Sequence, residues 1–313
     1  MTAIVTHFLA RRRTALNFAY LALASLMWSG QGTAVKVLDR QMGPIGITFL
    51  PFYITTLLLL PLLWRIRRTV SSRNPLSASD WGRFIVAGVG GQVLAQLGMT
   101  WGVSKALASN GAILNLLIPA ISAVLASLML REKLTMLRTA ALLIGLAGVL
   151  LMSLSDLREA SFQETTFLAG NLLILMGCLG SSFYNVYCKR LMRRFSEIEI
   201  LIFSYITASV ASLPFLLWME PASLRSFRFL DEKSWIAFAF LAIFMYGASM
   251  LLFFTALQHL EVTTASASLY LVPVFGVLLA VLLLGERLKS AQVLGSITVL
   301  VSTLLVMRYD PNY

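Results

Sequence analysis

Polar side chains recur inside the long apolar runs of this chain, where they are costly unless they meet a partner. Gln92 and Gln96 stand four residues apart and therefore share one face of a helix. Ser266 and Tyr270 have the same spacing in a later run. Amide and hydroxyl groups donate and accept hydrogen bonds without carrying charge. Such a set is suited to recognising a neutral or zwitterionic small molecule in an apolar setting.

The candidate binding residues share two properties: each is polar or aromatic, and each lies within an apolar run. Our hypothesis is that they line one polar, aromatic pocket near the middle of a membrane. The alternative for each is an ordinary hydrogen bond to a neighbouring helix, worth on the order of 1 kcal/mol. The residues are Trp28, Gln31, Gln92, Gln96, Asn110, Asn115, Tyr184, Asn185, Tyr246, Ser249, Ser266 and Tyr270.

Catalytic and metal chemistry find little support in the residue types. There is no pair of aspartates at membrane depth for an aspartyl protease, and His259 has no matched Ser or Cys partner. His7 and His259 supply no metal-binding cluster, so we expect no catalytic residue, metal or cofactor. Cys178 and Cys188 would lie about 15 Å apart along a helix, too far for a disulfide, and are expected to pack as small apolar residues.

One pattern occurs twice in the chain. Pro119 is followed by an apolar run and then by Arg-Glu-Lys-Leu, whereas Pro273 is followed by an apolar run and then by Gly-Glu-Arg-Leu. The proline precedes the glutamate, Glu132 or Glu286, by 13 residues both times. A single offset of 154 residues aligns the two copies without a gap. A repeat of half the chain length constrains any fold that we assign.

The repeated prolines and glutamates are expected to have structural or gating roles. Glu132 and Glu286 each follow a long apolar run beside a cation. A carboxylate there would accept hydrogen bonds from the N-terminus of the next helix, and proton coupling is the alternative role. Pro119 and Pro273 are expected to bend their helices and free a carbonyl group rather than contact a ligand.

Composition indicates a helical membrane protein. Of the 313 residues, 58% are hydrophobic and only 12% are charged, about half the roughly 25% charge of soluble domains. The net charge of +11 does not indicate a nucleic-acid partner, because the basic residues stand in short loops between apolar runs. The expected partners are a lipid bilayer and a small-molecule substrate, and the sequence leaves open whether the chain forms a homodimer.

The apolar runs predict ten membrane-spanning helices, five in each repeat. We interpret the run that follows Arg11, Arg12 and Arg13 as an uncleaved first span rather than a signal peptide. Gly98 and Gly102, four residues apart, predict close contact between helices. The expected repeats are residues 1–154 and 155–313. The predicted spans are 17–38, 46–64, 81–103, 106–130, 134–154, 167–189, 198–218, 234–257, 262–284 and 289–307.

The distribution of Lys and Arg predicts orientation. With the N-terminus inside, 16 of the 25 basic residues fall in inner segments, so both termini are expected in the cytoplasm and the protein in the cell membrane, inner or plasma. Because five is an odd number, the second repeat enters the membrane inverted relative to the first. An inverted repeat supports alternating access, in which two similar halves open a midplane site first to one side and then to the other.

With these motifs identified, a family resemblance becomes specific. A polar helix, the central Pro119 or Pro273, an Ala/Leu run and the Glu132 or Glu286 motif resemble the EamA domain, and two tandem copies resemble the drug/metabolite transporter (DMT) superfamily. The resemblance covers residues 17–307. It implies an all-α membrane fold with ten helices and a central cavity lined by helices one, three, four, six, eight and nine. It also implies export or exchange of small metabolites, as in bacterial amino-acid exporters.

The functional expectation is therefore an exporter or exchanger of small neutral or zwitterionic metabolites such as amino acids. No Asp or Glu lies in the middle of a predicted span, which argues against carboxylate-based proton coupling and a strongly cationic substrate. Two alternatives remain, a proton-coupled drug or metabolite efflux carrier and a membrane scaffold or receptor that transports nothing. A scaffold does not explain the inverted duplication.

Overall fold

The computed structural model describes residues 2–69, 76–105, 114–152, 165–284 and 290–309. Within these ranges all regular structure is helical, and no strand occurs. The helices are α1 (Thr2–Ser29), α2 (Gln31–Leu38), α3 (Pro44–Thr69), α4 (Ala78–Ile85), η1 (Val86–Val93), α5 (Leu94–Lys105), α7 (Ile118–Leu130), α8 (Met136–Met152), α10 (Thr165–Leu191), α11 (Glu197–Met219), α12 (Pro221–Ser226), η2 (Phe227–Phe229), α13 (Glu232–Ala239), η3 (Phe240–Ala248), α14 (Ser249–His259), α15 (Val262–Ala267), η4 (Ser268–Tyr270), α16 (Leu271–Leu284) and α17 (Ser290–Tyr309).

Six of the described helical segments are long and apolar enough to cross a membrane, which confirms the all-α membrane class predicted from composition. In the most apolar 18-residue stretch of each such segment, between 44% and 56% of the residues are buried. Large apolar side chains cover the outer surface, as expected where lipid replaces water. The most exposed include Met136, Leu128, Val210 and Leu282. Shorter apolar helices occupy 118–130, 136–152 and 290–305.

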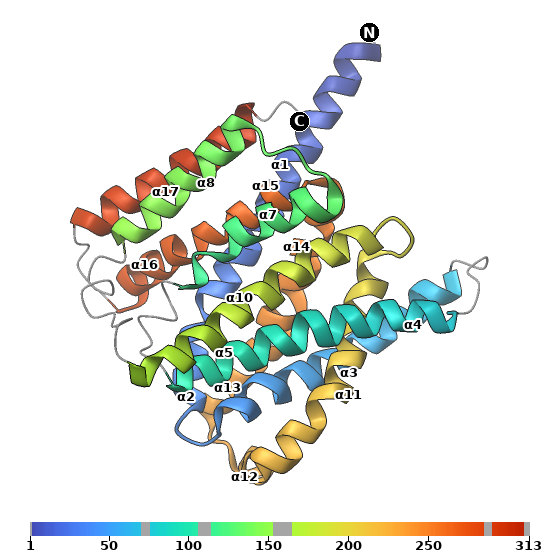
Figure 1. Cartoon of the computed structure of the whole chain (residues 1–313), viewed down its shortest axis with the longest axis vertical. Helices are drawn as coiled ribbons and strands as arrows, with labels where there is room; N and C mark the ends of the chain where they lie inside the picture. The colour runs from blue at the N-terminus through green and yellow to red at the C-terminus, as the bar shows by residue number, and fades with distance from the viewer. Residues whose placement is uncertain (1, 70–75, 106–113, 153–164, 285–289, 310–313) are drawn as a thin grey trace.

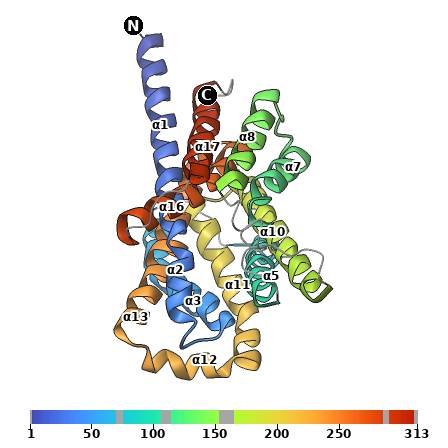
Figure 2. The ribbon, with the colours of Figure 1, turned by 90° about the vertical axis from the view of Figure 1, so that its left-hand side faces the viewer.

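The two repeats interleave rather than form separate lobes. Helix α10, which begins the second repeat, packs on α5 and α7 of the first, whereas α1 packs on α14 and α16 of the second. These contacts correspond to one another under the offset of 154 residues. Helices α8 and α17, the last of each repeat, lie side by side along one edge of the bundle (Figure 1). The view in Figure 2 shows α12 at the end of the molecule opposite the N-terminus.

Glycines bring the backbones of α5 and α10 together. A Cβ atom on Gly98 would lie 2.7 Å from the backbone nitrogen of Gly177, and one on Gly102 would lie 2.9 Å from the carbonyl oxygen of Gly170. Such distances leave no room for a side chain. The helix contact predicted from Gly98 and Gly102 is therefore confirmed.

The first predicted span, 17–38, is two helices rather than one. Helix α1 begins at Thr2, because the sequence contains no Gly or Pro before Gly30, and it ends at Ser29. The break coincides with a close approach, since a Cβ atom on Gly30 would lie 2.8 Å from the Phe240 ring. Helix α2 then carries the chain onward as a separate short segment.

The spans predicted at 106–130 and 262–284 are also interrupted, at corresponding positions. A turn at 116–117 precedes α7, whose second residue is Pro119. The 3-10 segment η4 separates α15 from α16, which carries Pro273 in its first turn. Proline lacks the N–H group that continues a helix and its ring clashes with the preceding turn, which explains the location of both interruptions.

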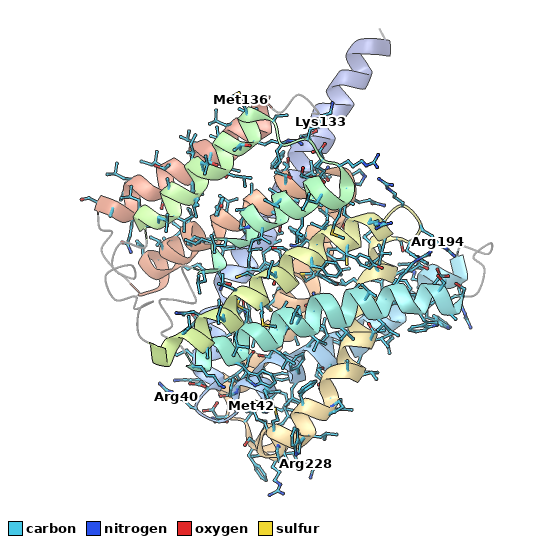
Figure 3. All side chains as sticks on the ribbon, in the orientation of Figure 1. Arg40, Met42, Lys133, Met136, Arg194 and Arg228 are labelled. Carbon is cyan, nitrogen blue, oxygen red and sulfur yellow. The ribbon has the colours of Figure 1, made fainter. Side chains whose placement is uncertain are left out.

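Basic side chains gather at the two ends of the bundle. Lys133 and Arg194 lie at one end, and Arg40 and Arg228 lie at the other (Figure 3). The first pair belongs to segments predicted to be inside and the second to segments predicted to be outside. At the Arg40 end, Asp231 caps α13 by accepting a hydrogen bond from the backbone N–H of Ser234, 2.8 Å away. Hydrogen bonding from Ser234 lowers the pKa of Asp231 from its ordinary value.

Candidate functional site

The third helix of each repeat contains a π-helical segment at the same position. In the first repeat η1 covers Val86–Val93, and in the second η3 covers Phe240–Ala248, which is 154 residues further on. Each segment carries one of the predicted binding residues, Gln92 in η1 and Tyr246 in η3. Short π-helical stretches are rare and are frequent at functional sites. Their recurrence in both repeats therefore indicates a functional site near η1 and η3.

Side chains from neighbouring helices satisfy backbone carbonyls around the π segments. Thr55 of α3 donates a hydrogen bond to the carbonyl of Ala242 at 2.6 Å. Tyr205 of α11 donates one to the carbonyl of Tyr246 at 3.0 Å. Thr207 of α11 donates one to the carbonyl of Phe84 at 2.9 Å, just before η1. Without water, each carbonyl left unpaired would cost free energy, so these bonds hold the irregular helices in place.

Several predicted binding residues lie in the main core of the bundle, which is built around α3, α10, α11 and the two interrupted helices. Gln96 donates a hydrogen bond to Gln92 at 3.4 Å. Gln92 is 6% exposed and Tyr184 only 2% exposed. The Tyr184 and Ser204 hydroxyls are hydrogen-bonded at 2.8 Å. The polar groups are thus gathered in one interior region, although Tyr184 already has a partner within the protein.

Aromatic rings surround this polar region. The Tyr246 ring meets Phe52 edge to face at 5.4 Å between centroids, and Phe52 also packs on Tyr205 at 4.1 Å. On the other side, the half-buried Trp28 lies 5.4 Å from Phe253. Phe52 and Tyr205 come from the second helix of each repeat, and they were not among the residues predicted from the sequence. The sequence gave little reason to single out these two residues, because aromatic residues are common in any helical core.

Tyr270 lies in a second, smaller core between α7, α8, η4 and α17, and Ser266 stands four residues before it in α15. Both side chains are almost fully buried, and neither the Ser266 hydroxyl nor the Tyr270 hydroxyl has a hydrogen-bond partner in the described part of the chain. The hydroxyl of Ser122 in α7 is also buried and has no hydrogen-bond partner among the described residues. Unpaired buried hydroxyls are unusual in folded proteins and require an explanation.

The remaining predicted binding residues have varied surroundings. Asn185 is buried, Gln31 is half-buried and Asn115 is exposed, with its side-chain oxygen 3.7 Å from the Cys178 thiol. Ser249 donates a hydrogen bond to the carbonyl of Met245 within its own helix. Asn110 and Glu286 lie outside the described residues.

Glu132 joins the two repeats. One carboxylate oxygen accepts a hydrogen bond from the backbone N–H of Val262 at 2.7 Å. The other accepts bonds from the backbone N–H of Thr263 at 3.1 Å and from its hydroxyl at 2.9 Å. The carboxylate therefore caps the N-terminus of α15, rather than that of α8, the next helix, which we had expected. Arg131 turns the chain toward α15 by adopting a left-handed conformation with φ 61°.

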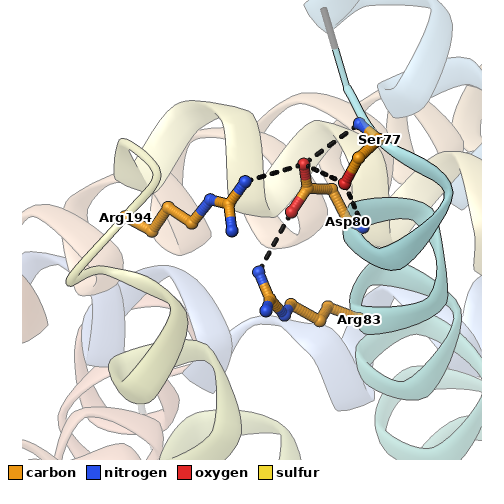
Figure 4. A network of polar contacts seen from close by, with 4 residues as sticks. All are labelled: Ser77, Asp80, Arg83 and Arg194. Carbon is orange, nitrogen blue, oxygen red and sulfur yellow. Dashed lines mark hydrogen bonds and ion pairs between the residues drawn. The ribbon is translucent and has the colours of Figure 1, made fainter. Parts of the chain in front are cut away.

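Ion pairs join the repeats at the same end of the bundle. Asp80 of α4 binds Arg83 at 3.0 Å and Arg194 of the second repeat at 3.1 Å, and it also accepts hydrogen bonds from Ser77 (Figure 4). Arg67 pairs with Glu199 at 3.3 Å. The segments predicted to face the cytoplasm contain Arg67, Asp80, Arg83 and Arg194, and Glu199 stands at the start of the predicted span 198–218.

Three further charged residues near Glu132 were not predicted from the sequence. Arg138 of α8 is 1% exposed and pairs with Glu261, which directly precedes α15. Lys189 of α10 donates hydrogen bonds to the carbonyls of Leu257 and Gln258 at the end of α14, at 2.6 and 3.0 Å. The repeat pattern gave no signal for these residues, because none of them has a charged counterpart at the offset of 154.

Two cavities lie at opposite ends of the bundle, and neither is lined by the predicted binding residues. The first has a volume of about 320 Å³ and is lined by Gln41, Arg225, Ser226 and Phe229. The second has a volume of about 280 Å³ and is lined by Leu130, Glu132, Lys189, Met192, Arg193, Gln258 and Glu261. Neither of these two cavities reaches the interior polar groups.

Comparison with known proteins gives relatives of similar length. The chain is 26% identical over 292 residues to an uncharacterized transporter of Archaeoglobus fulgidus, covering 92% of this chain and 97% of the relative. It is 22% identical over 231 residues to a protein of Streptantibioticus cattleyicolor named a probable terminal-alkyne amino-acid exporter, covering 74% of each chain. A crystal structure with a TM-score of 0.76 and 19% sequence identity covers 94% of this chain and 95% of its own, and thus has the same fold.

The family model that matches does so twice, once in each half of the chain. The EamA-like transporter family matches residues 17–154 and again residues 168–308, which together make up most of the sequence. The double match agrees with the repeat in the sequence and with the paired interruptions in the helices. The chain therefore belongs to the EamA-like transporter family and is a multi-pass membrane transporter rather than an enzyme.

Proposed function

We propose that the protein exports or exchanges small neutral or zwitterionic metabolites, such as amino acids, by alternating access around a site near the membrane midplane. The main support is the pairing of interruptions across the inverted repeat. Segments η1 and η3 recur at one offset, as do the breaks near Pro119 and Pro273. Transporters built from inverted repeats place their substrate sites where interrupted helices meet.

The side chains at this level can recognise a polar but uncharged solute. Gln92 and Gln96 offer amide donors and acceptors, and the Tyr246 ring, which packs on Phe52, offers an apolar surface in the equivalent segment. The buried, unpaired hydroxyls of Ser266 and Tyr270 support a role for α15 and η4 in binding. A substrate that supplies their missing hydrogen bonds would remove the cost of burying them.

The proposed substrate class follows from the absence of acidic residues in the middle of the predicted spans. No Asp or Glu lies in the middle of any predicted span, so a cationic substrate would have no partner charge there. A zwitterion bears no net charge and can be held by amides, hydroxyls and helix ends. The name of the Streptantibioticus cattleyicolor relative, a probable terminal-alkyne amino-acid exporter, supports amino acids as the first class to test.

The proposal includes a location and an orientation. We place the chain in the cell membrane, inner or plasma, with both termini in the cytoplasm and the bilayer as its structural partner. The excess of Lys and Arg in the segments that contain Lys133 and Arg194 supports this orientation. The repeats are proposed to be residues 1–154 and 155–313.

Flux of labelled solutes into liposomes that contain the purified protein tests this function. We expect saturable uptake of a neutral amino acid and recovery of that solute chemically unchanged. A proton-coupled carrier, the first alternative, would require a pH gradient for uptake. Uptake no faster than in liposomes without protein, across amino acids, nucleosides and small cations, would instead support a scaffold and contradict transport of these solutes.

A further inference from the structure

Charged contacts at one end of the bundle join α14 and α15 to the helices around them, and alternating access would require helices at this end to move apart. Glu132 follows α7 and caps α15, while Arg138 of α8 pairs with Glu261. Lys189 of α10 caps the end of α14. The contacts thus tie α15, the residue before it and the end of α14 to the segment after α7, to α8 and to α10. We call Glu132, Arg138, Lys189 and Glu261 the latch.

Most of the latch has no charged counterpart in the sequence of the other repeat. At the offset of 154 residues, Arg138 corresponds to Gln292 and Glu261 to Leu107. Lys189 corresponds to Val35. Only the glutamate is repeated, as Glu132 and Glu286. An inverted repeat with identical halves would favour neither conformation, so charged contacts that the repeat does not duplicate bias the equilibrium between the two conformations.

The burial of the latch makes this bias substantial. Arg138 is 1% exposed and also donates a hydrogen bond to the carbonyl of Lys133 at 3.1 Å. A buried guanidinium that is separated from a carboxylate loses an attraction that offsets the cost of its burial. Opening this end would separate Arg138 from Glu261 and would leave the N–H groups of α15 without the Glu132 carboxylate. Both losses oppose opening.

We infer that the latch is an asymmetric conformational lock that makes the form closed at the Glu132 end the resting state of the transporter. This inference rests on the proposed alternating-access function and adds to it which end is held shut and by which residues. If the predicted orientation holds, the resting protein is closed to the cytoplasm.

The test measures opening directly and requires no transport. Ala265 is fully buried on α15, so the thiol introduced by Ala265→Cys reports exposure of this end through its rate of reaction with a maleimide. The substitutions Cys178→Ser and Cys188→Ala come first, so that the reporter is the sole thiol. The variants Arg138→Gln and Lys189→Val each introduce the residue that the other repeat carries at that position. Arg193→Gln is the matched control, because Arg193 is exposed and lines the same cavity.

We expect Arg138→Gln and Lys189→Val to raise the labelling rate about fivefold or more, as typical conformational couplings do, and Arg193→Gln to leave it unchanged. The double variant Arg138→Glu with Glu261→Arg, which restores the ion pair in reverse, is expected to return the rate toward that of the parent. Equal rates in all variants would overturn the inference. An equal rise in the Arg193→Gln control would also overturn it, because the effect would then come from general surface charge.

A second readout serves if Arg138→Gln does not fold. Hydrogen exchange of the Val262 and Thr263 amides, which donate to Glu132, is expected to accelerate in Lys189→Val as well. Unchanged exchange in a folded Lys189→Val protein would contradict the inference. Because neither readout involves solute, failure of the lock is distinguishable from failure of the proposed transport function.

Discussion

Leu114 and Ser268 stand 154 residues apart, and the backbone carbonyl of each accepts a hydrogen bond from a side chain of a neighbouring helix. Cys178 of α10 donates to Leu114 at 3.4 Å, and Ser25 of α1 donates to Ser268 at 3.0 Å. Both carbonyls lie five residues before a repeated proline, where the regular helix is interrupted. The two halves of the protein therefore support equivalent breaks with equivalent contacts, despite different donor chemistry.

The Ser25 contact predicts a measurable contribution to stability. Ser25→Ala removes the donor and leaves the Ser268 carbonyl without that bond, so we expect a loss of about 1 kcal/mol in the free energy of unfolding. Thermal unfolding in detergent measures the change. Ser29→Ala is the control, because the Ser29 hydroxyl bonds within its own helix to Leu26. A loss in Ser29→Ala as large as that in Ser25→Ala would contradict a special role for the break.

The close packing of η1 predicts opposite results at two neighbouring glycines. A Cβ atom on Gly88 would clash with Thr207 and lie 2.5 Å from the carbonyl oxygen of Ser204. Gly88→Ala is therefore expected to destabilise the protein by about 1–3 kcal/mol. The nearest atom to a Cβ on Gly90 is 3.6 Å away in Phe183, so Gly90→Ala should be neutral or stabilising. Equal melting temperatures for the two variants would refute this packing.

Gln92 and Tyr246 occupy equivalent positions in η1 and η3, and both are predicted to contribute to the substrate site. Gln92→Ala and Tyr246→Ala should each reduce flux about tenfold or more, as expected when a buried polar or aromatic contact worth ~1.4 kcal/mol is lost. Val89→Ala and Phe244→Ala are matched controls in the same segments, because their side chains face outward. Wild-type flux in folded Gln92→Ala and Tyr246→Ala proteins would remove both residues from the site.

The unpaired hydroxyls predict that stability and affinity respond differently. Ser266→Ala and Tyr270→Phe remove hydroxyls that have no partner in the described residues, so the unfolding free energy should stay the same or rise. The substrate concentration that gives half-maximal flux should rise several-fold, on the order of the effect of one hydrogen bond. Ser302→Ala should lower the unfolding free energy and leave half-saturation unchanged, because Ser302 donates a hydrogen bond to the Ala141 carbonyl at 2.6 Å. Unchanged half-saturation in both Ser266→Ala and Tyr270→Phe would show that these hydroxyls do not bind substrate.

The duplication made much of the fold predictable. The offset that aligned Pro119 with Pro273 also aligned Gln92 with Tyr246, and the structure places interruptions at both pairs. Composition indicated the membrane class, because too few charged residues were present to cover a soluble surface. The family match over 17–154 and 168–308 agrees with the resemblance carried by the repeated motif.

Other features could not be predicted because no local pattern encodes them. Glycine-rich η1 predicts a weakened helix but not π geometry, and the carbonyls of η3 are bonded by side chains of other helices, those of Thr55 and Tyr205. Arg138 and Glu261 are 123 residues apart and lack charged counterparts, so the repeat gave no reason to pair them. Glu132 was recognised as a capping residue, but its helix, α15, comes from the opposite repeat.

Counterflow in liposomes is the most direct test of uncoupled exchange. Liposomes containing the protein are loaded with an unlabelled neutral amino acid, and a trace of the labelled solute is added outside. We predict transient accumulation of label that depends on the internal solute, saturates, and persists when the pH gradient is collapsed. Label entry that matches protein-free liposomes for every amino acid tested, or that occurs only with a pH gradient, would contradict an uncoupled exchanger of neutral solutes.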